Sequence, residues 1–467
     1  MKITGIRIHD QTSRVALSDA ERSEWARRAA ALLDGDWMLK TLAGAVNIAS
    51  PTGEERPFAE YLVSVMEESG LKSWVQPIDA LSANAIGEFG DGDGPSVMLF
   101  APLDSPFSGL EAEEVPWCGP ALRPDQLPVA QIQDGGVIGL SADNPKAHIV
   151  SSISAVAALK KAGVPVSGRV VLAFGAGGAP SNKRPPLARW NVGHGTGCEY
   201  LLQQGVRGDF AIITKPGYAV QWEEVGVCWF RVRIHGSQSY VGRKHALVDN
   251  NPILRAAQIM PLLEAWFGEY SRRHTDGLVA PQAAIGAIEG GWTYKPAFPP
   301  AACDIYVDMR ISPRTSPMQA WRELTAALAD IKTKLGDPSL AIDCNLVAAV
   351  EGPGTPENNW IVQSCTRAWE AVEGRKHEAL TQTSGQTEAA ILRRHGIPTA
   401  RVGLPSQMTP NAERPAHTMG VVKVSSMSKL AEVILRTLVD TCTRPLQEVG
   451  LADAEGEDME LQQRRRS

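Results

Sequence analysis

The stretch AHIVSSISAVAALKKAG, residues 147–163, is a helical pattern between two short apolar runs, SVMLFA at 96–101 and RVVLAFG at 169–175. A third run, DFAIIT at 209–214, follows further along the chain. Short continuous apolar runs that alternate with helices are typical of buried parallel strands. We therefore predict an α/β fold with a mixed, mostly parallel sheet covered by helices. Three helical patterns between Ser18 and Leu71 precede it, and Thr52 and Glu55 have the spacing of a capping box before the third.

A different pattern begins near Cys228. The alternating run CWFRVRIHG precedes a helical segment, two strand-like runs, a second helical segment and a last strand, at 228–236, 251–267, 283–291, 303–312, 318–336 and 340–349. The order βαββαβ is that of a ferredoxin-like unit, and the α/β pattern resumes after Pro353. We predict a discontinuous α/β domain of residues 1–228 and 349–449, an inserted ferredoxin-like α+β domain of residues 229–348, and a disordered tail at 450–467.

The composition limits the classes of partner. The chain has 46 basic and 52 acidic residues and a net charge of −6, which gives no reason to expect nucleic acid or an anionic membrane as a partner. We expect a small-molecule substrate. Seven cysteines without a C-x-x-C pair indicate free thiols and a cytoplasmic protein. No apolar run is long enough for a membrane helix, and the first residues lack the apolar core of a signal peptide.

Three segments give the chain a resemblance to a known family. VDMRISP at 307–313, SGQTEAAILRRHGIPTARVG at 384–403 and AHTMG at 416–420 are similar in order and spacing to motifs of the M20 metallopeptidases and aminoacylases. The resemblance covers about residues 36–445. It implies a zinc-exopeptidase-like α/β domain whose insertion is a lid and dimerisation domain, and hence a homodimer through residues 229–348. It also implies a hydrolase in which two zinc ions share an Asp and a Glu activates water.

The ligand positions implied by this resemblance have changed. The first ligand, His in an H-x-D motif, is replaced by Pro102 in PLD, although Asp104 keeps its second position. Asp143 occupies the position of the bridging Asp. The two adjacent glutamates expected next are missing, since no Asp or Glu occurs between Asp143 and Glu199.

Two further positions complete the set. Lys215 stands where the family has a carboxylate, and His417 matches the last ligand. Because a catalytic zinc ordinarily has three protein ligands, we expect no dizinc centre and no other cofactor, with a single weakly bound metal at Asp143 and His417 left open. A lysine at a lost metal site also suggests that the Lys215 amine pairs with Asp143, close to His417 and Asp104. The alternative is that Lys215 points to solvent and Asp143 caps the helix that begins at Pro145.

The lid positions have changed as well. Tyr240 stands where the family pattern has His, and His245 follows it closely. The family turn G-G-T-D reads GQTE and ends in Glu388. By resemblance, the substrate-binding candidates are Tyr240, His245, Asn251, Arg310 and Glu388.

Three functional hypotheses remain at this point. In the first, the chain is an enzyme that acts on a small amide, amino-acid-like or related C–N substrate without a dinuclear metal, with His417 as acid or base and Asp143, Lys215 and Asp104 beside it. In the second, it is a catalytically silent homologue that binds a ligand or partner. In the third, it is a metallohydrolase whose ligands have moved, with the candidates His148, His194, Glu223 and Glu224.

Overall fold

A computed structural model describes residues 17–181, 183–184, 189–246, 250–405 and 420–451. The chain divides into two compact units. Unit 1 holds the residues up to Trp222, Thr355–Ala379 and those from Ile391 onward; unit 2 holds Glu223–Gly354 and Leu380–Ala390. Unit 2 therefore also contains residues 223–228, 349–354 and 380–390, which the sequence pattern predicts to be part of the α/β domain. His417 lies outside the described residues.

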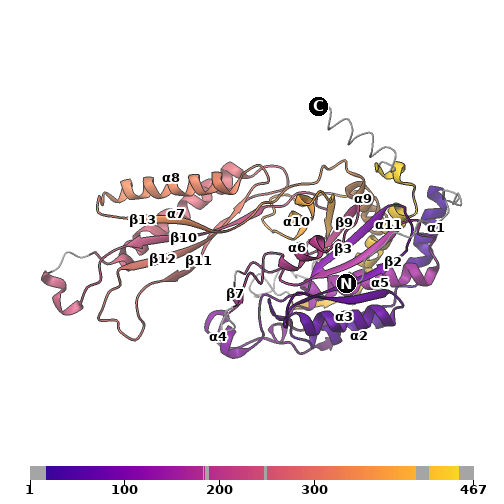
Figure 1. Ribbon diagram of the computed structural model, residues 1–467, viewed down its shortest axis with the longest axis horizontal. Coiled ribbons are helices and arrows are strands. Elements are labelled where there is room, and N and C mark those ends of the chain that lie inside the picture. The colour runs from indigo at the N-terminus through magenta and orange to yellow at the C-terminus, as the bar shows by residue number, and fades with distance from the viewer. Residues whose placement is uncertain (1–16, 182, 185–188, 247–249, 406–419, 452–467) are drawn as a thin grey trace. The chain divides into compact units, whose positions relative to one another are not determined.

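Unit 1 is built on a six-stranded sheet (Figure 1). The strand order is β1-β2-β6-β3-β9-β14. The four strands β6, β3, β9 and β14 are parallel, and β1 and β2 are antiparallel additions at one edge. The bounds are Lys72–Pro77, Ala83–Phe89, Arg169–Gly175, Ser96–Pro102, Phe210–Thr214 and Thr399–Val402 in that spatial order. The predicted mixed, mostly parallel sheet is confirmed.

Helices cover this sheet. The quoted stretch 147–163 forms α5, His148–Ala162, which ends at Gly163 with φ 72°. Its apolar residues are buried on nearly every side because β3, β6 and β9 lie against one side of it and α1 and α11 against others. The helices of unit 1 are α1 Asp19–Ala30, α2 Gly35–Val46, α3 Arg56–Glu68, α4 Glu111–Cys118, α5, α6 Thr196–Gln203, α9 Trp360–Glu373 and α11 Val424–Cys442; α10, Ala389–Arg394, crosses the unit boundary.

Short elements complete unit 1. Strands β4 Gln131–Gln133, β5 Gly136–Ile138 and β15 Val421–Lys423 form a small antiparallel sheet, and β7 Lys183–Arg184 pairs with β8 Arg189–Trp190. An irregular turn, Ala142–Ala147, leads into α5. No helix in the described part of the chain is both long and apolar enough to cross a bilayer. All seven cysteines are free thiols.

Unit 2 has the predicted βαββαβ order (Figure 1). Its elements are β10 Gly226–His235, α7 Pro252–His274, β11 Ala283–Glu289, β12 Ala302–Ile311, α8 Pro317–Leu335 and β13 Ile342–Val350. The strands form one antiparallel sheet in the order β11-β12-β10-β13. Alternate residues of β10 and β12 are buried, and α7 and α8 pack on that face. This is the ferredoxin-like arrangement expected from the sequence.

Candidate functional site

The parallel strands of unit 1 end at one edge of the sheet. β3 ends at Pro102 and β6 at Gly175, and these two residues are paired in register. β9 delivers Lys215 to the same edge, and β14 delivers Leu404. Open α/β sheets bind ligands at the carboxyl ends of their strands. This edge is therefore where unit 1 can hold a site.

Asp104 is buried just after β3, and both of its carboxylate oxygens are hydrogen-bonded. Oδ1 accepts from the backbone N–H of Gly178 (2.7 Å), and Oδ2 accepts from the N–H of Ala179 (2.8 Å) and the Thr52 hydroxyl (2.7 Å). These contacts fix the loop after β6 to the end of β3. Asp104 thus has a structural role that the sequence did not reveal.

Glu55 lies next to Asp104 and was not among the predicted site residues. Its Oε1 accepts from the backbone N–H of Gly53 (2.6 Å) and Gly177 (3.0 Å), and its Oε2 accepts from the Ser82 hydroxyl (2.7 Å). Complete burial, together with the charge of Asp104, raises the pKa of Glu55 to about 7. The expected capping box is wrong: Thr52 binds Asp104, and no side chain caps the start of α3.

The loop Gly177–Ala179 follows β6, where the M20 resemblance implies two adjacent glutamates. Its three backbone N–H groups all point at carboxylates from other segments, two at Asp104 and one at Glu55. Gly177 has φ 65°, and a Cβ there would collide with the Val192 carbonyl oxygen, so only glycine fits. The loop supplies donors to this edge, in place of acidic side chains.

Asp143 lies in the irregular turn before α5. It is largely buried, and burial raises the pKa of its carboxyl to about 7. No ion pair among the described residues joins it to Lys215, so the pair predicted from the sequence is not formed. Nor does the Asp143 side chain cap a helix, since α5 begins without a side-chain cap. The physical reason is local: the backbone of Asp143, and not its carboxylate, is what the surrounding residues bind.

His148 makes that backbone contact. Its Nδ1 donates to the Asp143 carbonyl oxygen (2.8 Å), and its Nε2 accepts from the N–H of Leu404 (3.4 Å); the tautomer follows from these partners. Complete burial lowers its pKa to about 3, and the positive charges of Lys215 and Arg401 act in the same direction. With both nitrogens engaged, His148 is a neutral structural residue and not a relocated metal ligand.

Lys146 is a second buried group that sequence reasoning missed. Its amine donates to the carbonyl oxygens of Ala45 (2.9 Å) and Ile48 (2.7 Å), at the end of α2, and lies 4.9 Å from the centre of the Phe58 ring. Burial lowers its pKa to about 7. Lys146 therefore holds the turn that carries Asp143 against α2.

The predicted lid residues all belong to unit 2, but they do not form one cluster. Tyr240 stacks on Phe298 (ring centroids 5.3 Å apart), and His245 is exposed six residues before Asn251, which caps α7 through the N–H of Ile253.

Arg310 lies at the other end of the sheet. It is paired in register with Val227, whereas Tyr240 follows the far end of β10, at His235, eight residues or about 26 Å away. The Arg310 guanidinium also binds Asp308 (2.7 and 3.1 Å). One small substrate held by a single unit 2 cannot contact both ends.

The remaining candidates are also engaged or buried. Glu388 is buried in the segment 380–390. Glu224 accepts from the hydroxyl (2.6 Å) and N–H (3.1 Å) of Thr387, and Glu223 pairs with Arg314. His194 is half-buried and has a positive φ of 56°. The two glutamates serve unit 2 as structural residues.

Comparison with known proteins agrees with this architecture. Residues 223–335 match the model of a peptidase dimerisation domain, M20_dimer. Human carnosine dipeptidase 1 superposes with a TM-score of 0.64 at 13% identity over 91% of this chain and 99% of its own.

Two further structures are similar in the same way. An M20 family metallo-carboxypeptidase from Sulfolobus solfataricus gives a TM-score of 0.62 at 13% identity, covering 86% of this chain and 98% of its own. The YXEP protein of Bacillus subtilis, a dinuclear metal binding peptidase from the M20 family, gives a TM-score of 0.53 at 15% identity. The match covers 91% of this chain and 100% of the YXEP chain. The chain has the M20 peptidase fold. Residues 223–335 are similar to the dimerisation domain of these peptidases.

The M20 fold implies a metal centre. The side chains at this edge of the sheet are not a set of metal ligands. Pro102 and the glycines at 177–178 offer no metal-binding side chain, and Lys215 is cationic. In the described part of the chain, no three or more His, Cys, Asp and Glu side chains come close enough together to hold a metal ion. Asp143 is the one acid that remains at an implied ligand position there, and His417 lies outside that part. We therefore derive no catalytic step through zinc.

Proposed function

We propose that this chain is an M20-type hydrolase relative that acts on a small amide, amino-acid-like or related C–N substrate without a dinuclear zinc centre. The observation that carries the proposal is the chemistry of the strand ends. Three neighbouring strands bring Pro102, the amide-donating loop 177–179 and Lys215 to the edge where the M20 resemblance implies metal ligands.

We choose Asp143 as the acid or base of this edge. The pKa of Glu55 is also raised to about 7, but its carboxylate is held by three protein donors. A group that exchanges protons in catalysis works best when its pKa lies near the operating pH, and burial raises the pKa of Asp143 to about 7. Lys215, directly after β9, supplies a positive charge to the same region, and this charge lowers the pKa of His148. The resemblance implies His417 as the last metal ligand; in the absence of the metal we assign it the partner role of acid or base.

The reaction class follows from what these groups can do. Without a metal to polarise a carbonyl and ionise water, attack on an ordinary amide is difficult. A strained or activated C–N bond, or a proton transfer next to a carbonyl, needs only a positioned acid and base. In such a reaction Asp143, Lys215 and His417 bind and orient the substrate and move a proton at the reacting atom.

The test combines metal content with turnover. The protein is purified without chelator, exchanged against zinc, manganese and cobalt, and measured by elemental mass spectrometry. We expect less than about 0.1 equivalents of any metal, and turnover of N-acyl amino acids, dipeptides or cyclic amides that a chelator does not change. One or two tightly held equivalents, with chelator-sensitive turnover, would refute the proposal.

A second function is favoured by one observation. The carboxylates of Asp104 and Glu55 are saturated by protein donors, as in a site that has kept its shape and lost its chemistry. In that case the chain is a silent homologue that binds its ligand unchanged. A thermal-shift screen followed by mass spectrometry of the ligand separates the two: stabilisation without conversion supports the silent homologue.

A further inference from the structure

Within the described part of unit 2, helices cover one face of the sheet. α7 and α8 pack on Phe230, Val232, Ile305 and the alternate residues that follow them on β10 and β12. The residues between these point to the opposite face, which we call the open face. It carries Trp229, Arg231, Arg233 and His235 on β10, and Asp304, Tyr306, Asp308 and Arg310 on β12. The open face is thus charged and aromatic, whereas the packed face is apolar.

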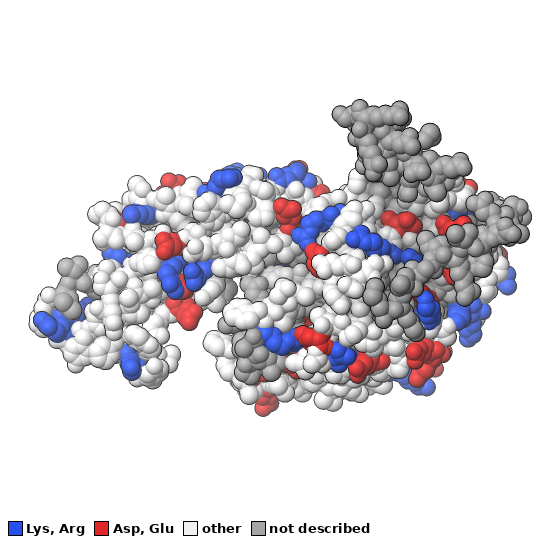
Figure 2. All heavy atoms as spheres, viewed as in Figure 1, with Lys and Arg blue, Asp and Glu red and all other residues white. Residues whose placement is uncertain are grey.

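The acidic residues of the open face are each hydrogen-bonded to another residue of that face. The pairs are Arg233 with Asp304 (2.8 and 2.7 Å), Arg310 with Asp308 (2.7 and 3.1 Å), His235 with Asp343 of β13 (2.7 Å) and Tyr306 with Glu289 of β11 (3.2 Å). Figure 2 likewise shows acidic and basic side chains interspersed on the side of unit 2 that faces the viewer. The described residues of the open face therefore have no excess of positive charge.

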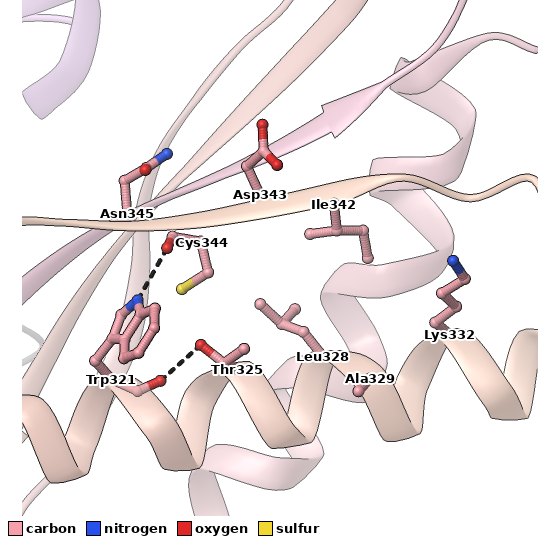
Figure 3. A pocket seen from close by; sticks show the side chains of 9 residues that line it. All are labelled: Trp321, Thr325, Leu328, Ala329, Lys332, Ile342, Asp343, Cys344 and Asn345. Carbon is pink, nitrogen blue, oxygen red and sulfur yellow. Dashed lines mark hydrogen bonds between the residues drawn. The ribbon is translucent and has the colours of Figure 1, made fainter.

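Arg231 is the exception on this face. It is in register with Tyr306 on β12 and with Asn345 on β13, and Figure 3 shows the Asn345 side chain on the side of β13 away from α8. The Nε of Arg231 is buried without a hydrogen-bond partner, and no ion pair or side-chain hydrogen bond among the described residues includes its guanidinium. A guanidinium has five N–H donors and keeps its charge. A bound anion would therefore recover the free energy that the unpaired donors cost.

Two aromatic rings lie beside Arg231. Tyr306 is directly across from it on β12, at a Cβ separation of about 5 Å. Trp229 comes two residues earlier on β10, about 7 Å away on the same face. Both rings are half-buried, and their polar ends are held, the Tyr306 hydroxyl by Glu289 (3.2 Å) and the Trp229 indole N–H by Asp308 (2.8 Å). Because the rings are already fixed, a flat apolar group can bind against them with little loss of conformational entropy.

The charges of the open face limit the kind of anion that it can bind. Aromatic residues on the sheet of a βαββαβ unit can stack on the bases of single-stranded RNA. A nucleic acid, however, also needs several cations for its phosphates, and here Arg233 and Arg310 are already paired with Asp304 and Asp308. Only Arg231 is left for an anion among the arginines of this face. The open face therefore favours a small ligand with one negative group.

We propose that the open face of unit 2 binds a small aromatic carboxylate at Arg231. The carboxylate accepts two N–H groups of the Arg231 guanidinium, and the Asn345 amide donates to it from β13. The ring of the ligand lies against Tyr306 and Trp229. Arg310, the substrate-binding candidate on the same face, is four residues from Tyr306 along β12, or about 13 Å. The site at Arg231 is thus separate from it and does not depend on the proposed function.

A ligand-observed NMR titration of the full-length protein tests this proposal. The probe is 3-phenylpropionate, and 3-phenylpropanamide is its uncharged match. Arg231→Met keeps the apolar stem and should weaken binding of the carboxylate at least about tenfold, because the charge-assisted hydrogen bonds are lost. Arg231→Lys should weaken it about threefold or more, since an ammonium cannot bind a carboxylate through two parallel N–H groups. The wild type should bind the amide at least about tenfold more weakly than the carboxylate.

The control variant is Arg322→Ala, which removes an exposed arginine of α8 and should bind the probe like the wild type. Circular dichroism checks that all variants are folded. Equal binding of 3-phenylpropionate by the wild type and Arg231→Met would mean that the probe binds elsewhere, and it would refute the proposal. So would equal affinity for the amide, or no binding by the wild type. Tighter binding of inorganic phosphate or of a uridine oligonucleotide than of the probe would refute the aromatic carboxylate as the ligand.

Discussion

Three carboxylates, those of Asp104, Glu55 and Asp143, lie near the same sheet edge of unit 1, and they differ in their hydrogen-bond partners. Asp104 and Glu55 receive six hydrogen bonds from the protein. Asp143 is also largely buried, but none of the hydrogen bonds between described residues goes to its carboxylate. A saturated carboxylate holds structure, whereas a buried one without such donors is held at a free-energy cost. The difference teaches that Asp104 and Glu55 hold the framework of this edge, and that Asp143 is the carboxylate on which our proposed function depends.

The largest expected effect is on turnover. Asp143→Asn should lower kcat/KM on any substrate by about 100-fold or more, the usual contribution of an acid or base. It should also raise the melting temperature at pH 8, because it removes a buried group that must ionise there. Enzyme assays and calorimetry on the same preparation check both.

The matched control is Asp134→Asn. Asp134 is an exposed carboxylate in the turn between β4 and β5 with φ 51°, which asparagine also adopts. The Asp134→Asn variant should change neither kcat/KM nor the melting temperature. Full activity of Asp143→Asn would remove Asp143 from the mechanism.

Next in size is the stability cost of Asp104→Asn. Both oxygens of Asp104 face backbone N–H groups, which cannot become acceptors. The new amide must therefore point one N–H at another N–H in a buried place, and we expect a loss of about 3 kcal/mol in the free energy of unfolding. Urea denaturation measures it. A loss below about 1 kcal/mol would show that the loop 177–179 does not depend on this carboxylate.

Lys146→Met should have an intermediate effect. The change keeps the apolar stem but leaves the carbonyl oxygens of Ala45 and Ile48 without their donor, at about 2 kcal/mol at pH 10. Since burial lowers the pKa of Lys146 to about 7, the wild type loses stability as pH falls from 10 toward 7. The loss of stability caused by Lys146→Met should therefore shrink as the pH falls from 10 toward 7. Denaturation curves at several pH values measure this loss. A loss that stays constant with pH would contradict the burial of Lys146.

The smallest effect is expected for Glu55→Gln. The Ser82 hydroxyl can accept as well as donate, so the glutamine amide fits where the carboxylate oxygen was, and the loss at pH 6 should stay below about 1 kcal/mol. The pKa of Glu55 is raised from 4.5 to about 7, so this group makes stability fall as pH rises between those values. Glu55→Gln should make stability fall less steeply between these pH values, as urea denaturation at several pH values would show. An unchanged pH dependence would contradict the raised pKa of Glu55.

The sequence predicted the framework better than the side-chain contacts. The βαβ run around 147–163 and the βαββαβ run of unit 2 are local patterns, and both formed as expected. Glu55 was missed because its spacing from Thr52 matched a local capping box, whereas its true partners include Gly177, more than a hundred residues away. Long-range hydrogen bonds of this kind leave no periodic signal.

The other differences have physical reasons of the same type. The Asp143–Lys215 pair was predicted because a lysine stands at a lost metal-ligand position, but the identity of a residue does not determine which way its side chain turns. The separation of Arg310 from Tyr240, in contrast, follows from antiparallel pairing of β10 with β12. The βαββαβ pattern already contained that information.

The length of β10 has a kinetic consequence. Arg310 lies beside the start of this strand and Tyr240 follows its end, about 26 Å away. If a small substrate touches both residues, the two must come from different copies of the chain. Activity per chain would then fall on dilution, in step with dissociation, and an inactive Arg310 variant mixed with an inactive Tyr240 variant would regain part of the lost rate.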